Sequence, residues 1–372
     1  MLLAALFVVR GILHPQLNYD AIPYVALAKE MRGDGGKSEA YREFADKVGS
    51  SGFQEYVSGS YRERMYRDDA FFQVNLPLFT SRPFYIFLCS VVGSLIHSDV
   101  AATYIISAVT AALALLLSYV IGGAAGLAGN WRLAVPLTWI IAGGLNLASL
   151  STPDALATFG GLLFVLTSIT GPWKGVRAVC LIILAVLIVT TRTEYLLLVT
   201  LLMLLEWLLE PRHRLIAALV VVVASSTYLM IQKISAPYGY VAILNFSLID
   251  HFPVPDVVPH WHGYVPMAIH QTLQILGENF EFSLFSLAVS LLAIAWFRER
   301  RVRAAGEADE FNQRALILSA ALALYLVLHF AFFPLPEARY LTIAYVLAGI
   351  LFARAVQPTA PTKAIQNRAP RQ

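Results

Sequence analysis

The sequence predicts an all-α polytopic membrane protein, and two properties of its composition support this class. Hydrophobic residues make up 58% of the 372 residues, whereas charged residues make up only 14%. A soluble domain carries about 25% charged residues, so we expect most of this chain to lie within a lipid bilayer, in agreement with its mean hydropathy of +0.65. The net charge is only +3 and the basic residues fall at the ends of apolar segments, so nucleic acid is not an expected partner.

Ten apolar segments are candidates for membrane-spanning helices. About 20 apolar residues cross the hydrocarbon core, and fewer are needed where a helix end is buried in protein. The segments lie near residues 1–13, 100–121, 133–150, 155–171, 178–191, 195–210, 215–233, 283–297, 314–333 and 340–356. We therefore expect a single transmembrane domain over residues 1–356, followed by a flexible cytoplasmic tail over residues 357–372.

The segment Pro83–Ile96 is ambiguous, and the distribution of basic residues decides how it is interpreted. If it is a shallow or re-entrant helix, every basic cluster falls on one face of the membrane, which is then cytoplasmic by the positive-inside rule. If it is a full crossing, all these clusters lie outside. They are Arg132, Lys174 with Arg177, Arg212 to Arg214, Arg298 to Arg303, and Lys363, Arg368 and Arg371. We therefore expect a re-entrant segment.

This topology places the remaining ionisable groups at the outer ends of the helices. Two extracytoplasmic loops, residues 14–82 and 234–282, and the turns at 151–154, 192–194 and 334–339 carry them. An ion-coupled transporter usually keeps charged residues or broken helices near the midplane. The apolar interiors of the spans therefore favour a site at the outer surface over a transporter or flippase of a lipid-linked saccharide.

The first outer loop is predicted to carry two amphipathic juxtamembrane helices, separated at Gly49. Apolar and aromatic residues recur at helical spacing on both sides of this glycine. They are Tyr41, Phe44, Ala45 and Val48 before it, and Phe53, Tyr56, Val57 and Tyr61 after it. Such helices would lie on the bilayer or cover the bundle.

Two histidines in the second outer loop, His260 and His262, have the spacing of a zinc-ligand pair, but no third ligand is evident. Trp261 and Tyr264 are more simply interpreted as interfacial anchors. The candidate ligands for a divalent metal ion are these two histidines with Asp20 and Asp154.

Asp20 directly follows the first apolar segment and opens the long polar loop. A carboxylate at this position is where an enzyme acting on a lipid-borne substrate would keep its chemistry. The alternative is that Asp20 only caps a helix or lies in solvent.

The order of these features resembles the GT-C superfamily of membrane glycosyltransferases, which includes protein O-mannosyltransferases and the aminoarabinose transferases of lipid A. An acid after the first helix and a long outer loop precede Ser81-Arg82-Pro83-Phe84-Tyr85. The stretch Thr152-Pro153-Asp154-Ala155-Leu156 is similar to the acidic turn of this superfamily, and Pro336-Glu337-Ala338-Arg339-Tyr340 is similar to its Arg-Tyr element. Many members have a paired acid in the first outer loop, whereas Ala21 follows Asp20 here, which leaves the need for metal open.

The resemblance implies an enzyme that moves a hexosyl or pentosyl group from a polyprenyl-phosphate carrier to a lipid, glycan or protein acceptor. The reaction would take place at the periplasmic face of a bacterial inner membrane, with inversion at the sugar carbon. Asp20 would be the catalytic base, and Asp154 would bind a metal ion, orient the acceptor or cap a helix. The implied substrate-binding residues are Arg82, Tyr85, Arg192, Glu194, Arg339 and Tyr340. A polysaccharide polymerase that joins lipid-linked repeat units is an alternative.

Overall fold

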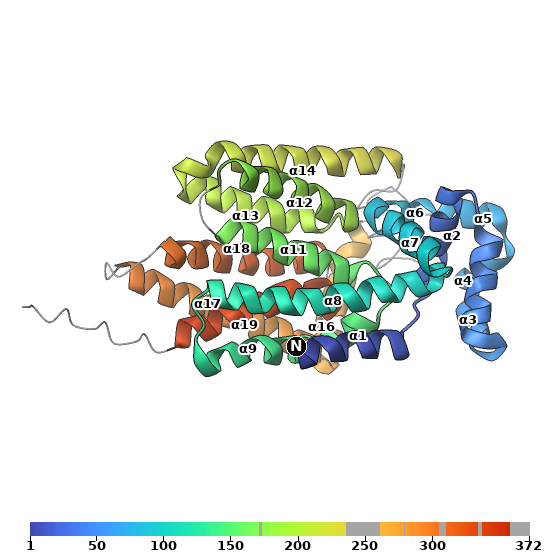
Figure 1. Cartoon of the computed structure of the whole chain (residues 1–372), viewed down its shortest axis with the longest axis horizontal. Coiled ribbons are helices and arrows are strands. Elements are labelled where there is room, and N and C mark those ends of the chain that lie inside the picture. The colour runs from blue at the N-terminus through green and yellow to red at the C-terminus, as the bar shows by residue number, and fades with distance from the viewer. Residues whose placement is uncertain (171–172, 236–260, 279, 305–309, 334–336, 358–372) are drawn as a thin grey trace, which may run out of the picture.

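The computed structural model describes residues 1–170, 173–235, 261–278, 280–304, 310–333 and 337–357, and every regular element in these ranges is a helix (Figure 1). Long helices run side by side in a bundle, and the helices of residues 21–96 gather at one end of it. We call this the loop end, and the opposite end the basic end.

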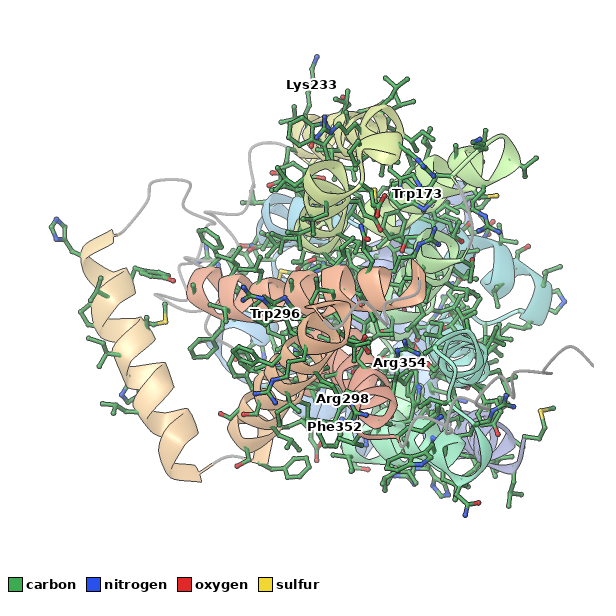
Figure 2. The ribbon with its side chains drawn as sticks, turned by 90° about the vertical axis from the view of Figure 1, so that its left-hand side faces the viewer. Trp173, Lys233, Trp296, Arg298, Phe352 and Arg354 are labelled. Atoms are coloured by element: carbon green, nitrogen blue, oxygen red, sulfur yellow. The ribbon has the colours of Figure 1, made fainter. Side chains whose placement is uncertain are left out.

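The bundle consists of α1 (Leu2–Leu13), α8 (Asp99–Ala124), α9 (Ala134–Ile141), α10 (Gly144–Ser149), α11 (Asp154–Ile169), α12 (Val176–Thr191), α13 (Tyr195–Leu209), α14 (Arg214–Ile234), α17 (Phe280–Ala304), α18 (Glu310–Phe332) and α19 (Ala338–Val356). The helix α16 (Trp261–Glu278) stands at the side of this bundle (Figure 2). The loop end adds α2 (Ala21–Arg32), α3 (Lys37–Val57), α4 (Ser60–Arg67), α5 (Asp69–Asn75), α6 (Pro77–Thr80) and α7 (Pro83–Ile96). Two 3₁₀ turns, η1 (Gly129–Leu133) and η2 (Pro211–His213), precede α9 and α14.

Four helices in the described part are long and apolar enough to cross a membrane: α8, η2 with α14, α18 and α19. This confirms an all-helical protein with membrane-spanning helices. Shorter apolar helices, α1, α11, α12 and α13, coincide with other predicted spans but fall below this length, so the ten predicted crossings are not established. The span predicted at 133–150 is instead two short helices, α9 and α10. They are separated at Gly143, whose φ of +74° is a left-handed conformation that glycine adopts without strain.

The segment from α5 to α7 is sharply bent. Residues Asp69–Thr80 and Pro83–Ile96 meet at 105°, which is the geometry of a broken span or a re-entrant loop. Pro83 begins α7, and a residue that precedes proline is disfavoured in the helical conformation. Arg82 is accordingly non-helical, with φ −123° and ψ 54°. The chain therefore turns at Arg82 and does not cross the bilayer as one straight helix over this region.

The loop-end helices form a packed unit with its own hydrophobic cluster. The helix α3 contains a break at Gly49, where φ is +75° and ψ is 164°, at the position that the sequence predicts. The cluster brings together Tyr19, Ala21, Ile22, Val25, Ala26, Ala40, Tyr41, Phe44, Val57, Met65, Phe71, Phe72, Leu76 and Val100. Because Val100 belongs to α8, these helices pack against one end of the bundle as well as against one another.

A buried ion network fixes α2 to the start of α8. The carboxylate of Asp99, only 2% exposed, accepts hydrogen bonds from Arg32 Nη1 at 2.9 Å and Nη2 at 2.7 Å. Lys29 Nζ lies 3.0 Å from the same carboxylate and 2.8 Å from Glu43 of α3. A buried charge is costly unless it is paired and hydrogen-bonded, and here both conditions are met. The network therefore determines where the first residue before α2, Asp20, lies relative to the bundle.

The opposite end of the bundle carries basic residues that are tied to carbonyls and acids (Figure 2). Arg354 of α19 pairs with Glu299 of α17 at 3.1 Å and donates a hydrogen bond to the carbonyl of Ala125 at 2.7 Å. Arg298 donates to the carbonyl of Gln357 at 3.3 Å. Charged groups thus concentrate at the two ends of the bundle, and the apolar helices separate them.

Candidate functional site

Polar residues from five distant parts of the sequence meet at the loop end, each at or next to a helix terminus. Asp20 occupies the N-cap position of α2, and Arg82 that of α7. Asp154 begins α11, Arg192 follows α12, and Glu194 precedes α13, while Arg339 and Tyr340 lie in the first turn of α19. We call these residues, together with Tyr24, the loop-end site.

Arg192 is the buried centre of this site. Its guanidinium, 7% exposed, forms ion pairs with Asp154 and with Glu194, the latter at 3.2 Å between Nη2 and Oε1. Asp154 is 2% exposed and also accepts a hydrogen bond from Thr152 Oγ1 at 2.6 Å. The N-cap residue of α11 is Pro153, so Asp154 does not occupy the cap position. It is therefore the counter-ion of Arg192, and we do not assign it the role of a base or a metal ligand.

Glu194 remains an anion in the turn between α12 and α13. Desolvation opposes its charge, but the guanidinium groups of Arg192 and then Arg82 hold the pKa of Glu194 at about 2. At neutral pH, Arg192 therefore faces two carboxylates. Its charge is already compensated, which makes Arg192 a poor primary ligand for a phosphate.

Arg82 is different, because it forms no ion pair among the residues that the structure describes, although its charge also helps to lower the pKa of Glu194. Its guanidinium lies 5.8 Å from the centre of the Tyr24 ring, and its closest polar contact is the carbonyl of Leu78 at 3.5 Å. The side chain is half-buried. Arg82 is therefore a cation with hydrogen-bonding capacity to spare at the loop end.

Arg339 and Tyr340 complete the site on the side of α19. Arg339 pairs with Glu337, and its Nη2 donates a hydrogen bond to the Tyr340 hydroxyl at 2.7 Å. The guanidinium groups of Arg192 and Arg339 each lie 4.6 Å from the centre of the Tyr340 ring, so this ring makes two cation–π contacts.

Asp20 is half-buried, and within the described residues its carboxylate makes no hydrogen bond or ion pair. Its backbone N–H donates a hydrogen bond to Asn18 Oδ1 at 3.1 Å. The side chain makes no capping bond to α2, although Asp20 occupies the N-cap position. Its charge acts on the phenols of Tyr24 and Tyr340. Asp20 thus lies at the cap position without its usual hydrogen bond, and its basic oxygens stay available.

Tyr24 lies near both the acid and the unpaired arginine. Burial raises the pKa of Tyr24 above its usual range, while the charge of Arg82 lowers it and that of Asp20 raises it. The sequence analysis did not identify Tyr24. The signal was its position four residues after Asp20, which places both residues on one face of a helix, but α2 itself was not predicted.

Other predicted site residues lie elsewhere. Tyr85 is completely buried, its hydroxyl donates to the carbonyl of Thr103 at 3.5 Å, and its ring packs against Tyr24 at 5.1 Å. In this structure Tyr85 supports Tyr24 and has no surface with which to contact a substrate. His262 is exposed on α16, and His260 lies outside the described residues. No group of three metal-ligating side chains occurs in the part of the chain that the structure describes, so Asp20, Asp154 and His262 do not form one.

Two further polar side chains point to the same region from within α18. His329 and Tyr325 are buried, and their Nε2 and hydroxyl atoms have no hydrogen-bond partner among the described residues. The His329 ring lies 6.4 Å from that of Tyr340. A histidine inside an apolar span is itself a signal of function, and the sequence analysis did not use it.

Comparisons with protein-family models, with curated proteins and with solved structures find no match to this chain. The functional interpretation therefore depends on the residues of the loop-end site.

We predict opposite effects on stability for the two aspartates of this site. Asp154→Asn removes a buried charge that faces Arg192 and should lower the free energy of unfolding by about 3 kcal/mol, as for other broken buried ion pairs. Asp20→Asn should change it by less than about 0.5 kcal/mol, because its side chain has no partner to lose. Thermal unfolding of the detergent-purified variants measures both. Equal losses in the two variants would contradict the assigned pairing.

Proposed function

We propose that this protein is a GT-C-like membrane glycosyltransferase that moves a hexosyl or pentosyl group from a polyprenyl-phosphate carrier to an acceptor. The observation that supports this most is that Asp20 and Arg82 both lie near Tyr24: the Arg82 guanidinium is 5.8 Å from the centre of the Tyr24 ring, and the charge of Asp20 acts on the Tyr24 phenol. One is a carboxylate and the other a guanidinium, and neither has an ionic partner in the described residues. A free base beside a free anion ligand, at one end of an apolar bundle, fits a phosphate-bearing lipid substrate.

The reaction follows from the chemistry of these two groups. The hydroxyl of the acceptor attacks the anomeric carbon of the sugar, and the bond from that carbon to the phosphate oxygen breaks. Asp20 takes the proton of the hydroxyl, a contribution of about 10²–10⁴ in rate. Arg82 stabilises the negative charge that develops on the departing phosphate, since a guanidinium can donate two parallel hydrogen bonds to phosphate oxygens. A single displacement inverts the anomeric carbon.

The other two arginines of the loop-end site are already paired with carboxylates. Arg192, held by Asp154 and Glu194, fixes the turn before α13 and packs on Tyr340. Arg339, in the first turn of α19, is paired with Glu337. Neither is as free as Arg82 to meet an incoming anion.

The membrane arrangement that we propose has ten crossings, with residues 14–82 and 234–282 on the extracytoplasmic side of a bacterial inner membrane. The basic end then faces the cytoplasm, in accord with the positive-inside rule. Helices α11, α12 and α13 have 16, 16 and 15 residues. Such short helices can cross where their ends are buried in protein, and burial of Asp154 and Arg192 at their loop ends fits this requirement.

Replacing the proposed base is the most specific test of activity. Asp20→Asn keeps the size of the side chain and removes its basicity, so transfer should fall at least about 100-fold. Asp68→Asn is the matched control, because Asp68 Oδ1 accepts a capping bond from the Phe71 N–H at 3.0 Å, remote from the proposed chemistry. The control should lose at most about 1 kcal/mol of stability and keep near-normal transfer.

Transfer is measured with purified protein and a panel of polyprenyl-phosphate sugars, with and without a chelator. Full activity of Asp20→Asn would remove Asp20 from the mechanism. A flippase predicts no transfer even for the wild type, and a polymerase predicts products that contain joined lipid-linked repeats.

The role of Arg82 makes a separate prediction about substrate affinity. Arg82→Lys keeps the charge but replaces the planar fork with a point charge, so the KM for the lipid-phosphate sugar should rise about tenfold. Arg339→Lys, whose charge is paired with Glu337, should change KM less. An unchanged KM in Arg82→Lys, measured in the same transfer assay, would rule out Arg82 as the phosphate ligand.

A further inference from the structure

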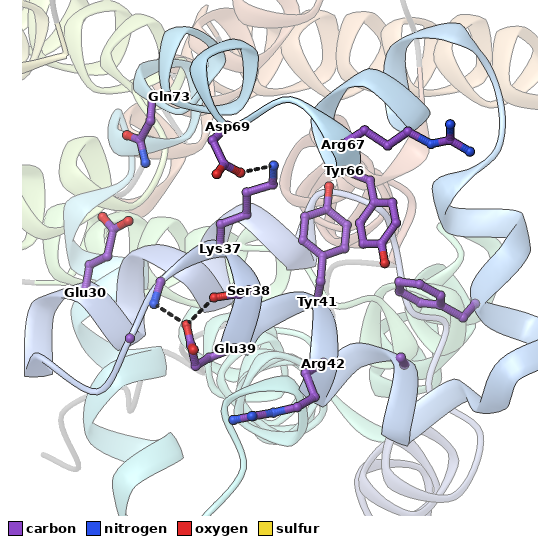
Figure 3. Close-up of a pocket in the computed structure, with 14 residues that line it drawn as sticks. Glu30, Lys37, Ser38, Glu39, Tyr41, Arg42, Tyr66, Arg67, Asp69 and Gln73 are labelled. Atoms are coloured by element: carbon purple, nitrogen blue, oxygen red, sulfur yellow. Dashed lines mark hydrogen bonds and ion pairs between the residues drawn. The ribbon is translucent and has the colours of Figure 1, made fainter.

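The loop-end helices enclose a cavity that the proposed transfer chemistry does not use. It has a volume of about 950 Å³ and is lined by residues from α2, the turn after it, α3, α4 and α5 (Figure 3). None of the residues of the loop-end site lines it. Tyr41 does, and its hydroxyl lies 3.3 Å from that of Tyr19, the residue before Asp20. The cavity is therefore a neighbour of the loop-end site and is distinct from it.

One wall of the cavity is aromatic. The rings of Tyr41 and Tyr66 lie 5.0 Å apart with an angle of 59° between them, and Phe53 lies 5.7 Å from Tyr66. Tyr66 is 42% exposed, so an outer ligand can reach its ring. An aromatic face attracts the C–H groups of a polar ring compound, and the phenolic hydroxyl adds a hydrogen bond at its edge.

The charges around the cavity cancel. Three acidic and three basic side chains line it: Glu30, Glu39 and Asp69, and Lys37, Arg42 and Arg67. Lys37 pairs with Asp69 at 2.6 Å, and Glu39 accepts a hydrogen bond from the Gly36 N–H at 3.0 Å. Arg67 pairs with Glu63 at 3.0 Å. The cavity thus has no excess of positive charge to attract a phosphate or a nucleotide, and a neutral ligand is favoured.

Three polar groups of the cavity make no hydrogen bond or ion pair with other described side chains. They are the carboxylate of Glu30, the guanidinium of Arg42 and the amide of Gln73. Each group is planar and presents two hydrogen-bonding atoms side by side. Such a fork matches two neighbouring hydroxyls on a sugar ring, because both hydroxyls can be bonded at once. All three side chains are exposed, so a polyhydroxylated ligand in the cavity can reach them.

We propose that this cavity binds a neutral oligosaccharide, with one sugar ring packed on Tyr66 and hydroxyls of its other units bonded by polar groups at other edges of the cavity, Glu30, Arg42 and Gln73. The aromatic wall, the cancelled charge and the three planar groups each favour this class of ligand. In a glycosyltransferase such a site would hold the glycan part of an acceptor. The binding itself does not depend on the transfer reaction.

The test measures binding directly. Wild-type protein in nanodiscs is titrated with mannotriose, maltotriose, chitotriose and galactotriose, and binding is followed by saturation-transfer NMR. At least one trisaccharide should bind with a millimolar or tighter Kd. Tyr66→Ala and Gln73→Ala should each weaken that binding by at least about fivefold. The matched control is Gln54→Ala, an exposed amide on α3 that does not line the cavity and should leave Kd unchanged.

The inference is wrong if no trisaccharide binds the wild type in the millimolar range, or if both cavity variants bind as the wild type does. Asp20→Asn separates this site from the proposed catalytic one. It should bind the trisaccharide with wild-type affinity whether or not the protein transfers sugar. Lost binding in Asp20→Asn would place the sugar in the loop-end site and would also overturn the inference.

Discussion

The loop end of this protein depends on the buried charge of Arg192. A guanidinium that is 7% exposed must be compensated, and Asp154 and Glu194 compensate it from the start of α11 and the turn before α13. The same guanidinium lies over Tyr340 and so ties in α19. When these ion pairs and that of Arg339 with Glu337 are set aside, one carboxylate and one guanidinium of the site stay without an ionic partner in the described residues. These two residues are Asp20 and Arg82, and the proposed function is based on them.

The position of Asp20 depends on a second buried charge, the carboxylate of Asp99 at the start of α8, which holds the far end of α2. Asp99 binds Arg32 and Lys29 near the end of this helix, and Glu43 extends the network to α3. A helix held at its far end and packed along its length leaves its first residues little freedom. The ion network at Asp99 therefore acts as a positioning element for the acid at the other end of α2.

The convergence of the site could be predicted from the sequence, because helices that alternate in direction bring every second helix end to the same face. This reasoning selected Asp20, Arg82, Arg192 and Arg339, which the structure brings together around Tyr24 and Tyr340. It could not distinguish the paired residues from the free ones, since that depends on side-chain partners far apart in the chain. For this reason the sequence did not reveal that Asp154 is the counter-ion of Arg192.

Local structure was harder to predict where the sequence pattern and the packing of the folded chain indicate different structures. The helix α2 was missed because Pro23 lies near its start and its polar residues come only at its end, although proline is tolerated in a first turn. The apolar run at 133–150 satisfies a hydropathy test as one span, but Gly143 turns the chain between α9 and α10. Tyr85 is part of the motif Ser81–Tyr85. Only the packing of the structure shows that its ring faces inwards against Tyr24.

The position of a bound lipid phosphate tests the proposed function most directly. We would determine the structure of the protein in nanodiscs with undecaprenyl phosphate. We predict density for the phosphate within hydrogen-bonding distance of the Arg82 guanidinium, at the loop-end site. Phosphate density at Arg298 and Arg354 of the basic end, or midway along the bundle, would contradict a loop-end catalytic site and favour a translocation pathway.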